Sequence, residues 1–208
     1  MLLALSACKI DVNGTDLDVV FEKDLEDISL RRNNYTEYVD YYLPSDVHQI
    51  EDSLLSESFE YNDSKFLMDV NISGIINNKY YKNTSVDDGF FDESKLVYRK
   101  QSTYRDMEDG LFDYIFSIYL EDNEYLICFN SKDLIFYGIA NKNDLDGLSS
   151  RILLMAKAAK VNEEKVVEDY SNKEVIDYEK KQVNLFETVM PVNGNINDFI
   201  INKNDSGE

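Results

Sequence analysis

The chain of 208 residues lacks the residues that several kinds of active site require. A Ser-His-Asp or Cys-His arrangement would have to use its single histidine, His48, and no GxSxG sequence is present. One histidine and one cysteine outside the N-terminal segment cannot fill a zinc site. The eight glycines form neither GxGxxG nor GxxxxGK, which excludes the common phosphate-binding loops. The absence of tryptophan argues against a carbohydrate-stacking platform.

Basic residues are also scarce, since 21 Lys and Arg stand against 41 Asp and Glu, for a formal net charge of −20. Nucleic-acid affinity comes largely from Lys and Arg that displace counterions, so we expect no nucleic-acid partner. No stretch beyond the N-terminus reaches the 18 or so consecutive apolar residues of a membrane helix. Any contact with a membrane must therefore involve the N-terminal segment.

The N-terminal segment MLLALSACKI contains an aliphatic residue, two small residues and a cysteine in the order Leu5-Ser6-Ala7-Cys8. This order resembles the lipobox of bacterial lipoproteins, in which the cysteine is lipidated and the leader is cut just before it. The resemblance implies lipidation at Cys8, a membrane partner through that lipid anchor, and an extracytoplasmic location on the cell surface. Two acyl chains would anchor such a protein firmly.

The same segment leaves two readings open. A signal leader carries a basic n-region and about 7 to 15 apolar residues, whereas no Lys or Arg precedes Cys8. Either the true start lies upstream, or the match is accidental and the protein is intracellular.

The chain length predicts one domain, because domains of this size are common. We expect a truncated signal and lipobox at 1–8, an acidic spacer at 9–20, a single domain over 21–201 and a frayed tail at 202–208. The domain begins near Phe21 because Phe21, Leu25 and Ile28 mark one face of a short helix.

Strands dominate the middle of the chain. Apolar residues alternate along 37–44 and along a hairpin, 56–61 and 65–72, whose turn contains Asn62, Asp63 and Ser64. A short helix follows at 73–81. Four further strands are predicted at 96–105, 111–120, 124–131 and 134–140. The second of them is expected to have one wet face, at Asp113, Ser117 and Tyr119. The last is apolar on both faces and is expected to be central.

Two helices follow the strands. Asn143 or Asp144 can cap the first, in which Leu145, Leu148, Ile152, Met155 and Ala159 form one stripe. The second, at 162–170, directs Val166, Val167 and Tyr170 toward the same body. The predicted class is α+β, with an antiparallel sheet of about five to seven strands packed by the long helix at about 144–160 and by shorter flanking helices.

The order of these elements over about 37–160 resembles the fold shared by the photosystem oxygen-evolving subunit PsbP and the Ran-binding protein Mog1. No motif accompanies this resemblance, so it implies no functional residue.

Candidate binding residues come from the surplus of tyrosine. The candidates are Tyr38, Tyr41, Tyr42, Tyr80 and Tyr81, because tyrosine offers a large rigid surface with one polar tip. Core and half-buried packing is the better account of most of these rings. Cys128 lies in an apolar run and is expected to be a small buried hydrophobic residue.

Carboxylates are abundant, but they match no metal motif. Asp144, Asp146 and Gly147 are similar to the middle of a calcium loop, yet Lys142 and Leu153 occupy its main ligand positions, and helix capping explains the same residues. A second cluster, Asp87 and Asp88 with Asp92 and Glu93, is explained by a solvated loop. We therefore assign no metal ligands, no catalytic residues and no cofactor.

Two functions remain. The first is a non-catalytic, lipid-anchored surface protein whose domain binds an unknown protein or small ligand. The alternative is a carboxylate- or calcium-dependent hydrolase acting on an envelope polymer, suggested by the acidic excess.

Overall fold

Seven antiparallel strands form the main sheet of the computed structural model, which describes residues 11–12, 15–27, 29–82 and 91–171. Their order across the sheet is β5-β6-β7-β11-β10-β9-β8. The bounds are β5 Val47–Asp52, β6 Ser56–Tyr61, β7 Ser64–Val70, β8 Leu96–Arg105, β9 Leu111–Glu121, β10 Glu124–Ser131 and β11 Leu134–Ala140. The predicted α+β class is confirmed, and β11 is central as expected.

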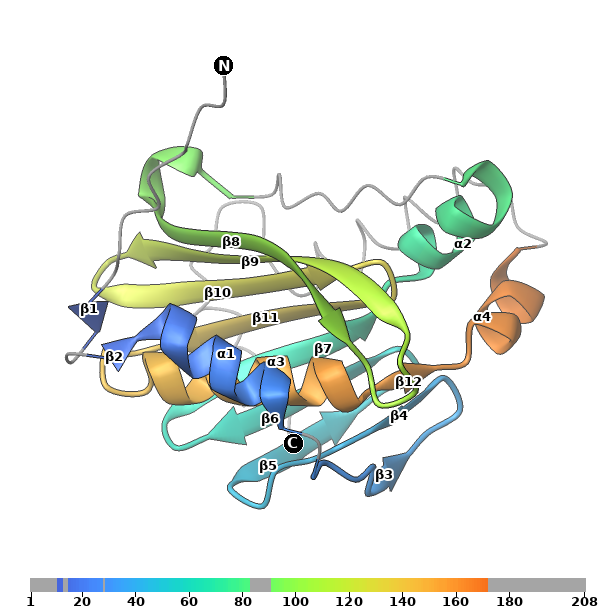
Figure 1. The fold of residues 1–208 in the computed structure, drawn as a ribbon, viewed down its shortest axis with the longest axis horizontal. Helices are drawn as coiled ribbons and strands as arrows, with labels where there is room; N and C mark the ends of the chain where they lie inside the picture. The colour runs from blue at the N-terminus through green and yellow to red at the C-terminus, as the bar shows by residue number, and fades with distance from the viewer. Residues whose placement is uncertain (1–10, 13–14, 28, 83–90, 172–208) are drawn as a thin grey trace, which may run out of the picture.

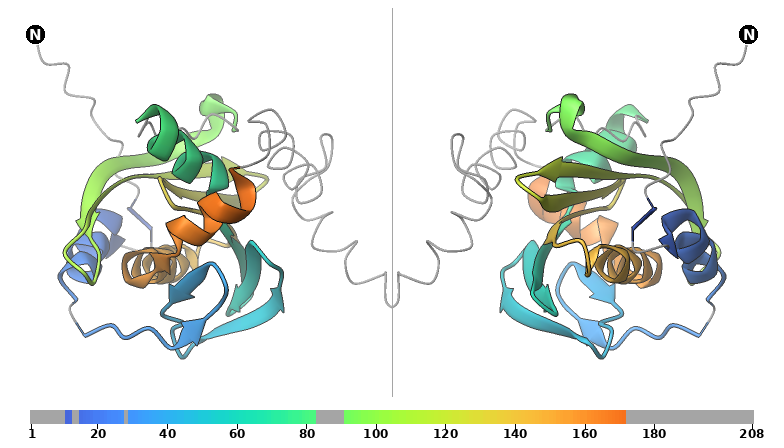
Figure 2. Two further views of the ribbon diagram at one scale, coloured as in Figure 1. Left: turned by 90° about the vertical axis from the view of Figure 1, so that its right-hand side faces the viewer. Right: turned by 90° about the vertical axis from the view of Figure 1, so that its left-hand side faces the viewer.

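Four helices accompany the sheet: α1 Leu17–Glu26, α2 Ile72–Tyr81, α3 Leu145–Ala158 and α4 Glu163–Tyr170. The sheet curls around α1 and α3, which pack against each other (Figure 2). Helices α2 and α4 contact each other at one end of the sheet (Figure 1). The long helix and the shorter flanking helices are therefore as predicted.

Helix α3 carries the apolar stripe that the sequence predicts. All five of its stripe residues are buried, and they face the sheet and α1. Asp144 is the N-cap residue, but its side chain does not cap the helix. Its carboxylate instead accepts hydrogen bonds from Asn62 at 2.9 Å and Asn141 at 2.7 Å, which ties the β6–β7 turn to the start of α3.

The wet face predicted for β9 is correct at Asp113, which is exposed, and wrong at the other two positions. Ser117 and Tyr119 are buried, with exposed fractions of 0% and 1%. Phe91 covers this outer face of the sheet, with its ring 5.1 Å from Tyr119 and 6.0 Å from Tyr137. Cys128 is buried on the same face, as expected, beside Tyr137. Alternation along β9 therefore separates two buried faces rather than a dry one and a wet one.

Strand β5 was not predicted, and the single histidine, His48, lies exposed on it. Only Val47 of this edge strand is buried, so the strand has no apolar alternation and is held by main-chain pairing with β6. Its register shifts between Gln49 and Glu51.

Short strands complete the fold. A second sheet has the order β12-β4-β3, with bounds β3 Asn34–Tyr35, β4 Val39–Tyr41 and β12 Lys160–Val161. β1 Asp11–Val12 pairs with β2 Thr15–Asp16. Helix α1 begins at Leu17, inside the segment expected to be a spacer, because Leu17 and Phe21 are both buried in the core.

Candidate functional site

The five candidate tyrosines do not gather on one surface. Tyr38 and Tyr41 lie in the core, with exposed fractions of 3% and 1%. The Tyr38 hydroxyl donates to Asp169 at 2.7 Å, and the Tyr41 hydroxyl donates to the buried Glu57. Burial and these carboxylates raise the pKa of both phenols. Tyr42 is half-buried, and only Tyr80 and Tyr81, near the end of α2, are well exposed.

Other predicted positions have structural roles or lie outside the described residues. Residues 1–8, with Cys8, and the cluster at Asp87 and Asp88 are outside them, as are 172–201 of the expected domain and its tail. Asp92 caps a short 3-10 turn by accepting from the Ser94 amide at 2.9 Å. Within the described ranges, no group of three or more His, Cys, Asp or Glu side chains could hold a metal ion.

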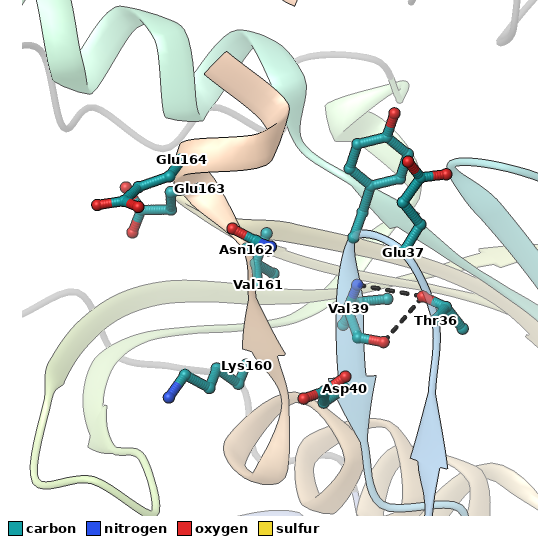
Figure 3. Close-up of a pocket in the computed structure, with 10 residues that line it drawn as sticks. Thr36, Glu37, Val39, Asp40, Lys160, Val161, Asn162, Glu163 and Glu164 are labelled. Carbon is teal, nitrogen blue, oxygen red and sulfur yellow. Dashed lines mark hydrogen bonds between the residues drawn. The ribbon is translucent and has the colours of Figure 1, made fainter. Parts of the chain in front are cut away.

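A large hollow of about 470 Å³ opens where β4, β12 and the start of α4 meet (Figure 3). Its wall begins at the β3–β4 turn, which is closed by hydrogen bonds between Thr36 and Val39 at 2.9 and 3.1 Å. Lys160 lies opposite Asp40 in the register of β12 and β4. The main-chain amide of Asn162 donates to the Tyr38 carbonyl at 2.8 Å. The carboxylates that line this hollow are Glu37, Asp40, Glu163 and Glu164.

The first turn of α4 presents two of these carboxylates. Asn162 caps the helix by accepting from the Lys165 amide at 3.2 Å, which fixes the position of Glu163 and Glu164 (Figure 3). Acidic residues in the first turn also match the positive end of the helix dipole.

A small hollow of about 180 Å³ shares Lys160, Val161 and Glu163 with the large one. We call the two together the β12 groove. Apolar walls come from the rings of Tyr104 and Phe112, stacked 5.5 Å apart, and from Leu134, Ala156, Ala159 and Val161. Carboxylates line the small hollow as well: Asp106, Glu108, Asp133 and Glu163.

Asp133 is the buried carboxylate of the small hollow, with an exposed fraction of 7%. It lies in the tight connection between β10 and β11. The main-chain amide of Asn71 donates a hydrogen bond to the Asp133 carbonyl at 2.8 Å and holds this connection in place. The buried Oδ1 of Asp133 accepts no hydrogen bond, although the Lys132 ammonium lies 3.2 Å away. Burial raises the pKa of Asp133 to about 6, and the charge of Lys132 offsets part of this effect.

Basic side chains bridge the remaining carboxylates. Lys132 donates to Glu163 at 2.8 Å, and Lys160 donates to Glu108 at 2.8 and 3.0 Å. Arg32 reaches Glu108 at 3.0 Å. Hydrogen bonds from Lys160 and Arg32 lower the pKa of Glu108. The groove is therefore acidic, and its charged groups are largely held in place by ion pairs.

Sequence reasoning missed this site. Asp133 was visible only as a turn residue, and Glu163 only as part of a helix. A carboxylate at the tip of a hairpin between two largely apolar strands is the one local signal that could have directed attention to Asp133.

Comparisons with known proteins yield no relative, because no family model, curated protein or solved structure matches the chain. The resemblance to PsbP and Mog1 therefore stays a prediction. In the part of the chain that the structure describes, no helix has both the length and the apolar character needed to cross a membrane.

Proposed function

We propose that the protein is a lipid-anchored surface protein whose domain binds a ligand in the β12 groove without catalysing a reaction. The observation that carries this proposal is the groove itself. It combines apolar walls, an acidic rim and a buried carboxylate that lacks a hydrogen bond. Sites for small ligands commonly have apolar walls and a few placed polar groups.

A library of small fluorinated compounds screened by NMR against the full chain tests the binding role. Val161 lines both hollows, so Val161→Trp should fill them and weaken every groove ligand by about tenfold or more. Val19→Trp is the matched control because Val19 is exposed on α1. Ligands that bind equally to both variants would show that the groove is not the binding site.

The lipid anchor is tested by the intact mass of the protein made from its native locus. We expect the membrane fraction to contain a chain that begins at diacylated Cys8, and Cys8→Ser to release the protein from that fraction. An unmodified chain in the soluble fraction would contradict the anchor and favour an intracellular protein.

A hydrolase acting on an envelope polymer is the second candidate, favoured by the raised pKa of Asp133. A carboxyl group with a pKa of about 6 can act as a general acid near neutral pH. Its neighbours Glu163 and Glu108 are engaged by lysines, which supports binding over catalysis. Turnover of an envelope polymer that is lost in Asp133→Asn would establish the hydrolase instead.

A further inference from the structure

The residues that line the small hollow have the chemistry of a binding site for an alkylammonium group. A cation fits where a carboxylate supplies charge and an aromatic face supplies further attraction. Asp133 provides the carboxylate, and Phe112 stacked on Tyr104 provides the aromatic wall. The hollow is large enough for about six water molecules, which is the size of a short alkyl chain.

Lys132 shows how an alkylammonium is held at the edge of this hollow. Its Nζ lies 2.8 Å from Glu163 Oε1, 3.2 Å from Asp133 Oδ1 and 5.5 Å from the centroid of the Phe112 ring. Burial lowers the pKa of this ammonium, but Glu163 and Asp133 more than compensate, so the net shift is upward. The surroundings thus stabilise a charged amine even though the side chain is largely buried.

The buried Asp133 Oδ1 is held only by the 3.2 Å ion pair with Lys132 and accepts no hydrogen bond of good geometry, which is unfavourable. An ammonium group that donated directly to Oδ1 would satisfy it. Lys132, from the same hairpin connection, lies closer to Glu163 at 2.8 Å than to Asp133 Oδ1 at 3.2 Å.

We propose that the small hollow binds a primary alkylammonium group, which donates to Asp133 and competes with the Lys132 ammonium. This inference rests on the proposed function, because it names the ligand class of the same groove. The group can come from a free diamine or from a lysine side chain of a partner protein. Both carry the same chemistry, and the outer carboxylates of the large hollow would hold the rest of either ligand.

Ligand-observed NMR on the full chain at about pH 8 tests the proposal with cadaverine and with Nα-acetyl-lysine methylamide. The uncharged controls are 1-pentanol and Nα,Nε-diacetyl-lysine methylamide, which should not bind. Asp133→Asn should weaken the amines by about tenfold or more, because the anchoring charge is lost. Asp63→Asn, an exposed carboxylate in the β6–β7 turn, should change nothing.

Lys132→Met gives the distinguishing readout. If Lys132 only forms a structural ion pair, this variant should bind the amines equally well or more weakly. If the Lys132 ammonium competes with the ligand, the variant should bind the amines about threefold or more tightly. Methionine retains an apolar stem beside Phe112, and circular dichroism would verify that the variant is folded. The stronger of the two amines identifies the source of the ammonium.

The pH dependence supplies a third readout. Asp133 faces Lys132 from its own connection, Glu163 from α4, and Asp106 and Tyr104 from the β8 side. Amine affinity should fall as the pH drops through about 6, because a proton then competes for the carboxylate. If neither amine binds while other groove ligands are lost in Val161→Trp, the ammonium proposal is overturned and the binding function stands. If the Val161 variant affects no ligand, the binding function itself fails.

Discussion

The free energy of unfolding is expected to rise as the pH falls from about 7.5 to about 5, the opposite of ordinary acid destabilisation. Asp69 on β7 is buried, and its Oδ1 accepts no hydrogen bond. Burial raises its pKa to about 6, and a bond with Ser56 offsets part of this effect. A carboxyl group whose pKa is higher in the fold than in the unfolded chain stabilises the fold at low pH, and that stabilisation is lost as the pH rises through about 6.

The size of this effect follows from the two pKa values. A pKa of about 6 in the fold against about 3.9 in the unfolded chain corresponds to about 3 kcal/mol in full, of which about 1.4 kcal/mol appears between about pH 7.5 and about pH 5. Asp133 contributes in the same direction. Groups with lowered pKa, such as Asp46, lose their stabilisation only at more acidic pH.

Asp69→Asn isolates the contribution of this carboxylate. The variant should be about 2 kcal/mol more stable than the parent at about pH 7.5 and should respond less to acid, as measured by urea unfolding at both pH values. Asp63→Asn should leave the pH response nearly unchanged, because Asp63 is exposed. A parent chain that loses stability between these pH values would contradict the role given to Asp69.

Replacement of Lys157 by methionine should destabilise the fold by about 3 kcal/mol. Lys157 lies on α3 with an exposed fraction of 6%, and its ammonium donates to the carbonyls of Asp24, Leu25 and Asp27 at 3.2, 2.6 and 2.5 Å. These carbonyls belong to the end of α1, where helical partners are missing and the dipole favours a cation. Without the ammonium, the Leu25 and Asp27 carbonyls would lose this donor, and the Asp24 carbonyl would keep, among the described residues, only its 3.3 Å bond from the Asp27 amide.

Lys23→Met is the matched control for that variant. Lys23 is also near the end of α1, but it is exposed, so its loss should change the unfolding free energy by less than about 0.5 kcal/mol. Chemical unfolding of both variants distinguishes the specific contacts of Lys157 from a general effect of charge on the helix. Equal stability of the two variants would contradict this account.

The sequence predicted elements whose apolar pattern is long and regular. The strands from β8 to β11 and the stripe of α3 were found because each spans several periods. β5 was missed because its two apolar residues, Val47 and Ile50, do not alternate with polar ones. β3 and β12 were missed because two-residue strands have no period, whereas β4 lies within the predicted strand at 37–44. The reading of β9 failed because side chains outside the strand cover this face: Phe91 packs on Tyr119, and Arg99 donates a hydrogen bond to Ser117.

The candidate site depends on long-range contacts that a single sequence does not contain. Glu108 lies between β8 and β9, Asp133 lies between β10 and β11, and Glu163 lies in α4. Only the fold brings these three residues around one hollow. Tyr38 and Tyr41 show the converse, because tyrosines that suggested a surface are held in the core by hydroxyl bonds to Asp169 and Glu57.

The strand order of the main sheet also determines how the chain can assemble. Every neighbouring pair joins strands consecutive in the chain except β7 and β11, which pair from Val70 with Leu134 to Lys65 with Ile139. Two locally paired units, β5 to β7 and β8 to β11, can therefore form independently and early. Their joining must close a long loop, so we expect the pairing of β7 with β11 to limit the folding rate.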